Sequence, residues 1–382
     1  MNLGFDAKRA FHNATGLGNY SRDVLRLLHA HAPEHRLYGY DGREGPIAFD
    51  PGERFHVRRP STALWRAFPA AWRQGGMVRD LRRDGIALFH GLSGELPLGL
   101  GSSGIAGVVT VHDLIFERHP ELYPLADRWI FRWKARSAAR RADLVVAASE
   151  QTRRDLVEIY AVPEEKIRVV YQGCGDAFRS PVPEERLEEV ARAWSLPPRF
   201  VLSVGTIERR KNLLLAVKAV EGIPGLSLVA VGRPTAYARE VEGYVASRGL
   251  LGRVRMLRDV PQGDLAAMYR LARALVYPSL FEGFGIPIVE ALVSGTPVVT
   301  TRGGCFAEVG GPGSAYVDPT DPEELREALA GILADPARRE AMRVAGLAHA
   351  ARFAGPEIAR ALLAVYAEAV GRRARAPGRG FG

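Results

Sequence analysis

The feature that most constrains this fold is a repeated alternation of short apolar runs with longer amphipathic segments. Such alternation is typical of parallel strands, because the chain needs a helix-length crossover to return from one parallel strand to the next. It therefore predicts an α/β protein. The expected strands lie at 87–90, 107–111, 144–148, 167–171, 200–204, 226–231, 274–279, 298–301 and 315–318.

The length of the chain, 382 residues, is too great for one compact core, so we expect two domains. A polar link containing Pro181 and Pro183 separates the two sets of strands. We place the boundary there, with a first domain over 1–180 and a second over 181–355. A final helix is expected at 356–370, followed by a basic, Gly- and Pro-rich tail at 371–382 that is predicted to be disordered.

One short cassette holds two carboxylates, Glu282 and Glu290, with seven residues between them. The strand pattern before it ends at Pro278, and Pro287 suits the first turn of a helix that runs to about Val293. Glu282 is therefore predicted at the carboxyl end of a strand. In an open α/β sheet, ligands bind at that edge.

A second cluster follows the strand at 200–204. The chain turns at Gly205, and Arg210 and Lys211 come just before a predicted helix. Cations beside the free amides of a helix N-terminus form an anion site that suits a diphosphate. A basic helix cap is the structural alternative.

In the first domain, His112 and Asp113 directly follow the buried strand at 107–111, which places them at the carboxyl edge of its sheet. A structural histidine is the alternative there. The loop with Gly16 and Gly18 lacks the third glycine of the dinucleotide fingerprint and a ribose-binding acid, which argues against a nicotinamide site.

Taken together, the cassette and these loops resemble retaining, nucleotide-sugar-dependent glycosyltransferases of family 4, the group 1 type, which includes bacterial mannosyltransferases. The resemblance runs from about Asp6 to Tyr366. It implies the GT-B fold, with two Rossmann-like domains whose parallel sheets face each other across a cleft. It also implies a C-terminal helix that crosses back to the first domain.

The same resemblance implies roles for the cassette. Glu282, Gly283, Phe284 and Gly285 would hold the donor sugar, and Glu290 would take the ribose hydroxyls.

The resemblance assigns the other residues as follows. Arg210 and Lys211 would neutralise the donor phosphates, while Gly205, Gly232 and Val260 would line the nucleotide site. In the first domain, His112 would contact the donor sugar, Asp113 would shape the acceptor side, and the loop of Gly16 and Gly18 would approach the diphosphate. The chain departs from the family pattern with Asn19 for an arginine, Gln172 for an asparagine and Arg209 for a proline, and with Arg258-Asp259 where a hydrophobic residue and a glycine are common.

The sequence contains no Asp-x-Asp pair, which the other common glycosyltransferase fold uses to hold a divalent metal. We therefore predict metal-independent transfer without a cofactor beyond the nucleotide-sugar co-substrate. Arg210 and Lys211 would stabilise the leaving diphosphate, while Glu282 and His112 orient the hexose. Retention of configuration is inferred from the family.

Resemblance of the stretch from His112 to Tyr123 to mannosyltransferases makes GDP-mannose the expected donor, with UDP-glucose or UDP-N-acetylglucosamine as alternatives. The expected acceptor is a glycan or a polyprenyl-linked sugar in cell-surface polysaccharide or lipopolysaccharide synthesis. Two other classes stay open. One is a phosphorylase or sugar-nucleotide epimerase on the same scaffold, and the other is a catalytically silent sugar-nucleotide-binding scaffold at a membrane.

The net charge of +9 is concentrated in two arginine-rich stretches, 54–83 and 118–141, each with two tryptophans. They suit an anionic membrane surface or a pyrophosphate-bearing acceptor, and solvated helix faces are the alternative. Nucleic acid is not expected, because no binding motif accompanies the charge. With two distant cysteines, no secretory signal and no span-length apolar run, the expected location is cytoplasmic, with peripheral contact at the inner face of the membrane.

Overall fold

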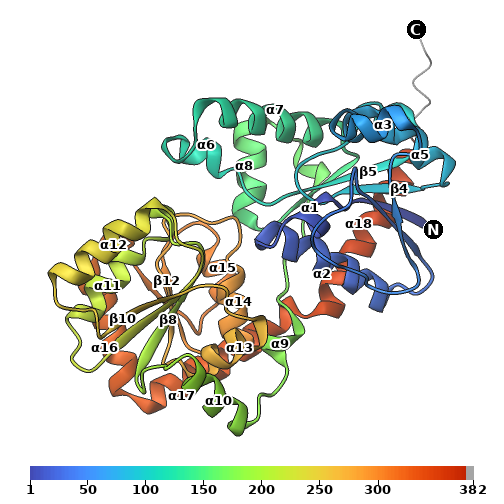
Figure 1. The fold of residues 1–382 in the computed structure, drawn as a ribbon. Helices are drawn as coiled ribbons and strands as arrows, with labels where there is room; N and C mark the ends of the chain where they lie inside the picture. Colours follow the sequence, from blue (N-terminus) through green and yellow to red (C-terminus); the bar gives the residue numbers. More distant parts are fainter. Residues whose placement is uncertain (376–382) are drawn as a thin grey trace. The chain divides into compact units, whose positions relative to one another are not determined.

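A computed structural model describes residues 1–375, which form two compact units (Figure 1). Unit 1 comprises Met1–Gly173 together with the chain from Ala354 onward, and unit 2 comprises Cys174–Phe353. The division therefore falls after Gly173, a few residues before the link at which we expected it. Each unit contains one parallel sheet with helices packed on it, which confirms the predicted α/β class.

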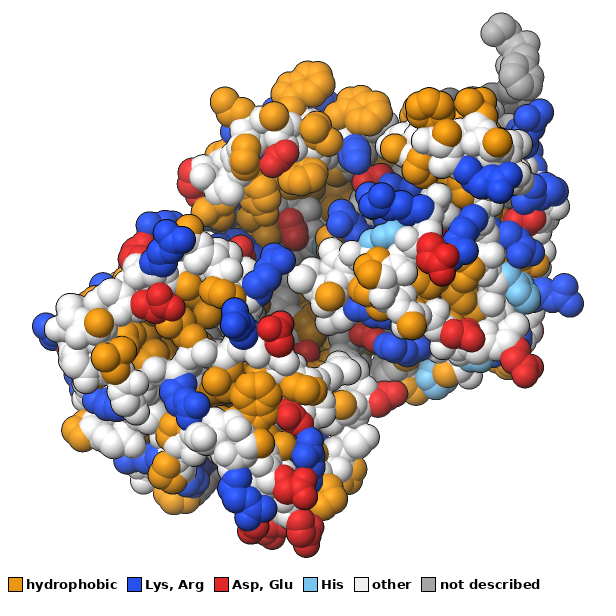
Figure 2. All heavy atoms as spheres, in the orientation of Figure 1, with side chains coloured by type: hydrophobic (Ala, Val, Ile, Leu, Met, Phe, Trp, Pro, Cys, Tyr) orange, Lys and Arg blue, Asp and Glu red, His pale blue; other side chains and the backbone are white. Residues whose placement is uncertain are grey.

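Unit 1 is built on a seven-stranded sheet in the order β3-β2-β1-β4-β5-β6-β7. Its strands are β1 (Asn2–Asp6), β2 (Arg36–Tyr40), β3 (Phe55–Arg58), β4 (Leu88–Gly91), β5 (Ala106–Val111), β6 (Leu144–Ala147) and β7 (Ile167–Val169). Its helices are α1 (Lys8–His12), α2 (Gly16–His31), α3 (Ala63–Ala67), α4 (Pro69–Ala71), a π-turn (Trp72–Gly76), α5 (Met77–Arg83), α6 (Ile115–Arg118), α7 (Leu125–Arg141), α8 (Glu150–Tyr160) and α18 (Gly355–Arg375). Short 3-10 turns cover Leu100–Ser102, Pro120–Leu122 and Glu164–Lys166. Figure 2 shows apolar side chains gathered along the upper edge of this unit, where α7 lies.

The C-terminal helix α18 packs on unit 1, although it follows the whole of unit 2 in sequence. Its apolar residues recur at helical spacing, so one stripe of the helix joins the core of α2 and the central strands. The guanidinium of Arg168 adds a bidentate pair, donating to the two Glu368 oxygens at 3.0 and 2.6 Å. The crossing-back helix is confirmed. It continues to Arg375, beyond the predicted start of the tail at Gly371, and the rest of the tail, 376–382, lies outside the described residues.

Unit 2 is built on a six-stranded sheet in the order β10-β9-β8-β11-β12-β13. Its strands are β8 (Phe200–Val204), β9 (Ser227–Val231), β10 (Val254–Leu257), β11 (Leu275–Tyr277), β12 (Val298–Thr301) and β13 (Ala315–Val317). Its helices are α9 (Asp176–Arg179), α10 (Glu184–Ala193), α11 (Leu213–Glu221), α12 (Ala236–Ser247), α13 (Gln262–Leu271), α14 (Ile286–Val293), α15 (Phe306–Gly310), α16 (Pro322–Ala334) and α17 (Pro336–Ala350). Short 3-10 turns cover Arg209–Lys211 and Ala351–Phe353.

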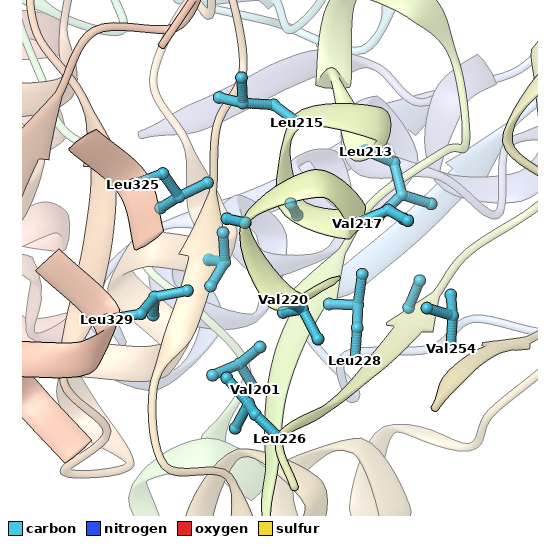
Figure 3. Packing of buried hydrophobic residues seen from close by; sticks show 14 of the residues in the cluster. Val201, Leu213, Leu215, Val217, Val220, Leu226, Leu228, Val254, Leu325 and Leu329 are labelled. Carbon is cyan, nitrogen blue, oxygen red and sulfur yellow. The ribbon is translucent and has the colours of Figure 1, made fainter. Parts of the chain in front are cut away.

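Helix α11 is apolar on most of its circumference because it lies between the sheet and α16 (Figure 3). Val217 and Val220 pack toward the strands, while Leu325 and Leu329 of α16 complete the cluster. Full burial of such a side chain contributes roughly 1.5–3 kcal/mol. This packing fixes the start of α11, and with it the loop that carries Arg210 and Lys211.

Candidate functional site

The loops after β8 and β9 touch each other through two glycines. Gly205 has a φ of +142°, which favours glycine, and its N–H donates to the Val231 carbonyl at 2.9 Å. A Cβ at Gly232 would lie 1.8 Å from the Gly205 carbonyl oxygen. Glycine is therefore favoured at 205 by the backbone conformation and required at 232 by the close approach of these two loops. The Lys211 side chain lies beside Gly205, with its Cε 3.4 Å from where a Cβ would stand.

Arg210 and Lys211 lie in the 3-10 turn that follows, immediately before α11. Asn212 adopts a left-handed conformation, with φ +55°, and redirects the chain into the helix. The Leu280 N–H donates to the Arg210 carbonyl at 2.8 Å, which ties this turn to the segment after β11. Two loops that are about seventy residues apart in sequence thus form one rigid edge of the unit 2 sheet.

Glu282 binds both cations. Its Oε1 accepts from Lys211 Nζ at 2.6 Å, and its Oε2 lies 2.7 Å from an Arg210 Nη1 nitrogen. Lys211 Nζ also donates to the Tyr277 hydroxyl at 2.6 Å, and Arg210 pairs with Glu208. Three of the four predicted catalytic residues therefore lie in direct contact within unit 2. We call Arg210, Lys211 and Glu282 the charged triad.

Burial and the two cations act in opposite directions on Glu282. The carboxyl group is buried, which by itself favours the protonated form, but Lys211 and Arg210 outweigh burial and lower its pKa to about 2. For Arg210, burial lowers the pKa, while Glu282 and Glu208 raise it above the usual arginine value. Glu282 therefore stays ionised between its two cationic partners at neutral pH. A carboxylate has about four acceptor positions, so Glu282 can also accept hydrogen bonds from sugar hydroxyls.

The loop after Glu282 presents main chain, because its apolar side chain points inward. Phe284 is buried and meets Phe353 edge to face at 5.7 Å between ring centroids. The Cys305 thiol donates to the carbonyls of Glu282 and Phe284 at 3.3 and 3.1 Å. Gly285 has a φ of +102° and immediately precedes α14. The sugar-binding role expected of Phe284 can therefore come from its backbone.

Glu290 lies on α14, as the cassette predicts, and its carboxylate is held by a tyrosine. The hydroxyl of the fully buried Tyr269 donates to Glu290 Oε2 at 2.8 Å, which fixes the direction of the carboxylate. Burial and the charge of Glu290 raise the pKa of Tyr269, so the tyrosine keeps its proton. Gly283 is buried beside Glu282 in the chain, and Val260 is half-buried in the segment that follows β10.

His112 follows β5 in unit 1, and both of its ring nitrogens have partners. Nε2 lies 2.9 Å from the Leu92 carbonyl and Nδ1 lies 3.0 Å from the Gln172 amide nitrogen. Because a carbonyl can only accept and an amide nitrogen can only donate, Nε2 carries the proton and Nδ1 accepts. The Tyr20 ring lies edge-on to the imidazole at 4.6 Å between centroids. His112 is thereby held in one tautomer and one orientation.

The His112 imidazole is expected to stay neutral at pH values well below the usual histidine pKa. Burial is the main cause that lowers its pKa to about 4; nearby Arg9 lowers it further, and the Leu92 carbonyl opposes the shift. Nitrogen-15 NMR of the imidazole should show the Nε2–H tautomer, with protonation only as the pH approaches about 4. In Gln172→Ala the tautomer preference should weaken, since Nδ1 loses its donor. A charged ring at neutral pH would contradict this arrangement.

The other predicted residues of unit 1 are Asp113, which follows His112 in the chain, and Gly16 and Gly18 in the first turn of α2. A Cβ at Gly18 would lie 1.7 Å from the Asn13 carbonyl oxygen, so glycine is required there by packing, whereas a Cβ at Gly16 would meet no atom within 4 Å. Asp113 accepts from the Ile115 N–H at 3.1 Å. The Asn19 oxygen accepts from Arg22 at 2.6 Å. Asn19, which stands where the family has an arginine, is therefore bound to Arg22 in this chain.

Sequence reasoning did not assign a role to the side chains that orient the predicted ones. Tyr277 bonds Lys211, Tyr269 bonds Glu290, Cys305 holds the loop after Glu282, and Tyr20 and Gln172 surround His112. Gln172 carried a signal, because it departed from the family pattern. The tyrosines carried none, since an apolar strand or helix position does not reveal where a hydroxyl points.

Within residues 1–375, no three His, Cys, Asp or Glu side chains gather as metal ligands would. Metal independence stays a prediction. No helix of this described part combines the length and the apolar character that crossing a bilayer requires.

Two family profiles match most of the chain. Residues 14–176 match Glycosyltransferase Family 4, and residues 186–348 match Glycosyl transferases group 1. An O-antigen chain mannosyltransferase B of Escherichia coli is 27% identical over 360 residues, 89% of this chain and 92% of that protein. A D-inositol 3-phosphate glycosyltransferase of Xylanimonas cellulosilytica is 34% identical over 244 residues, 61% of this chain and 58% of that protein.

Among solved structures, the HepE protein of Anabaena, determined with UDP and glucose, superposes with a TM-score of 0.75. It is 18% identical, and the match covers 96% of this chain and 99% of that one, which establishes the shared fold. The two profiles follow one another along the chain, and each sheet carries predicted site residues at the carboxyl ends of its strands. The chain thus belongs to the GT-B glycosyltransferases in which a family 4 domain precedes a group 1 domain.

Proposed function

We propose that this protein transfers mannose from GDP-mannose to a glycan or polyprenyl-linked acceptor in cell-surface polysaccharide synthesis. The reaction would take place in the cytoplasm, with retention of configuration and without a metal ion. The observation that carries the proposal is the charged triad, Arg210, Lys211 and Glu282, at the carboxyl edge of the unit 2 sheet.

The charged triad suits the leaving group. A nucleoside diphosphate gains negative charge as its bond to the sugar breaks, and two cations fixed by a buried carboxylate can stabilise that charge without reorganising. Lys211 and Arg210 are held by Glu282, by Tyr277 and by the Phe281 carbonyl oxygen, so their positions are set before the donor arrives. In the proposed step the bond from sugar C1 to the diphosphate breaks, the bond from C1 to the acceptor oxygen forms on the same face, and the acceptor proton leaves with the diphosphate.

The remaining predicted residues are proposed to bind and orient. Glu290, directed by Tyr269, would accept from the ribose hydroxyls, and Glu282 would accept from the sugar. Since His112 carries its proton on Nε2 and is fixed by Leu92 and Gln172, it suits a positioning role better than proton transfer. Asp113 would contact the acceptor.

Mannose is favoured by the names of two relatives, the O-antigen chain mannosyltransferases of Escherichia coli and Salmonella typhimurium. UDP-glucose or UDP-N-acetylglucosamine is the second candidate, supported by the UDP and glucose in the Anabaena structure. A catalytically silent sugar-nucleotide-binding scaffold is the third. Arg258 and Asp259, just before Val260, also depart from the family pattern, in the segment expected to reach the base, so this segment does not distinguish the candidates.

A donor panel tests the proposal. Purified protein is incubated with GDP-mannose, UDP-glucose or UDP-N-acetylglucosamine, with and without a lipid-linked acceptor fraction, and nucleotide release is measured. Release of GDP from GDP-mannose, increased by acceptor, is the expected result. Calorimetry with GDP and UDP should show tighter binding of GDP.

Each other outcome has a defined meaning. Release of UDP alone would replace the donor assignment by the second candidate. Binding without turnover would favour the silent scaffold. Dependence on inorganic phosphate would indicate a phosphorylase, and product formation without any acceptor would indicate an epimerase. No binding of any nucleotide would reject all of these functions.

A further inference from the structure

Helix α7 exposes a group of large apolar side chains on the surface of unit 1. Leu125, Trp129, Ile130, Phe131 and Trp133 expose 78, 73, 48, 40 and 49% of their surfaces. Figure 2 shows this concentration along the upper edge of unit 1, over the helix labelled α7 in Figure 1. Exposed tryptophans in a contiguous patch are uncommon on a monomer and mark interaction surfaces.

Arginines continue the same patch. Trp129, Trp133, Arg136 and Arg140 recur at helical spacing, so they lie on one face of α7. With Arg132, Ser137 and Arg141 they line a shallow surface pocket. Arg132 is paired with Glu117, whereas within the described part of the chain Arg136 and Arg140 form no ion pair. The face therefore combines aromatic rings with positive charge that no carboxylate offsets.

Small residues anchor the helix from behind. Ala135, Ala138 and Ala139 are buried against the unit 1 core. The large apolar residues of α7 thus point outward and its alanines inward, the reverse of an ordinary surface helix. A basic helix with exposed tryptophan and leucine is typical of helices that lie in the interface of a bilayer.

The other arginine-rich stretch, 54–83, has this arrangement only in part, because some of its side chains are committed to the core of unit 1. Trp72 is fully buried, and its indole N–H donates to Asp80 at 2.7 Å. The Arg73 guanidinium is largely buried and pairs with Asp6 and Glu95 at 2.5 and 3.3 Å. Leu64 and Phe68 of the same stretch are 62 and 59% exposed, but no pocket lined by aromatic rings and arginines is found beside them in the described part of the chain.

We propose that α7 docks this protein onto a membrane surface that contains anionic phospholipid. Trp129 and Trp133 would lie at the level of the headgroups, and Arg136 and Arg140 would bind lipid phosphates. A second copy of the chain is the rival occupant, but pairing two α7 faces would bring their arginines together. Charge complementarity therefore favours lipid. The inference goes beyond the sugar-transfer proposal and does not depend on which donor is used.

Flotation with vesicles tests the docking surface. Wild-type protein should float with vesicles of phosphatidylglycerol and phosphatidylcholine in equal parts, and remain behind with phosphatidylcholine alone. High salt should release it, because surface charges are screened. Arg136→Glu with Arg140→Glu, and separately Trp129→Ala with Trp133→Ala, should each lower the partition coefficient about tenfold or more.

Matched variants on unit 2 serve as controls. Leu251→Ala removes a side chain with 72% exposure, close to that of Trp129, and Arg239→Glu reverses an exposed charge on α12. Both should float like wild type. Equal flotation of the α7 variants and wild type, or equal binding to both vesicle types, would overturn the proposal. Light scattering that showed a dimer lost in Trp129→Ala would instead assign this face to a second copy. Binding of GDP should be unchanged in the α7 variants, which separates this outcome from failure of the sugar-transfer proposal.

Discussion

Replacing Lys211 with alanine should lower the rate of sugar transfer at saturating donor by roughly 10²–10³. Lys211 is one of two cations fixed at the proposed diphosphate site, and its loss leaves the developing charge of the leaving group to Arg210 alone. The fold should survive, because Glu282 keeps Arg210 as its partner. The measurement is kcat, together with circular dichroism to verify that the variant is folded.

Lys218 provides a matched control for this experiment. It lies on α11, the helix that Lys211 precedes, and its ammonium is exposed over the Tyr244 ring at 5.7 Å. Lys218→Ala removes the same charge and should leave kcat unchanged. If Lys211→Ala and Lys218→Ala had equal kcat values, Lys211 would have no part in stabilising the leaving group.

The second large effect concerns stability. Glu282→Gln keeps the size of the side chain but removes the buried charge that two partly buried cations share, so Arg210 and Lys211 lose their common counter-ion. Breaking a buried ion pair from one side costs about 3–5 kcal/mol. We expect urea unfolding at neutral pH to show a loss of that order, whereas Glu242→Gln, an exposed glutamate on α12, should change the free energy of unfolding little.

The pH dependence of the free energy of unfolding tests the same ion pairs independently. The pKa of Glu282 is about 2 in the folded protein, against an ordinary value of 4.5. A lowered carboxyl pKa stabilises the fold above the ordinary value, and this contribution is lost as the pH falls from 4.5 toward 2. Its full size is about 3 kcal/mol. In Glu282→Gln this part of the acid dependence should be absent, and an unchanged acid profile would contradict the ion-pair arrangement.

The central strands could be predicted from the sequence because they are nearly continuous runs of Val, Leu and Ile. The strands β1, β2, β3 and β10 could not be predicted in that way. Gly4 and Gly39 interrupt the apolar runs of β1 and β2, and glycine is needed there because of neighbours that are distant in sequence. A Cβ at Gly39 would lie 2.5 Å from the Phe55 ring, and one at Gly4 would lie 3.1 Å from Ile86. Local periodicity cannot show such long-range packing.

The site could be predicted in part for a similar reason. Spacing alone placed Glu282 and Glu290 around one strand-to-helix loop, and Arg210 and Lys211 before a helix, as the structure has them. Spacing could not show that Glu282 is the counter-ion of both cations, since the partners are 71 residues apart for Lys211. Nor could composition show that the Trp72 ring would be buried in the core of unit 1 with its N–H donating to Asp80.

A crystal structure with bound GDP tests the central claim most directly, that the charged triad of unit 2 is the donor diphosphate site. We predict phosphate oxygens within hydrogen-bond distance of the Arg210 and Lys211 side chains, and ribose hydroxyls at Glu290. GDP bound elsewhere, with Lys211 and Arg210 contacting only the protein groups they contact now, would contradict it.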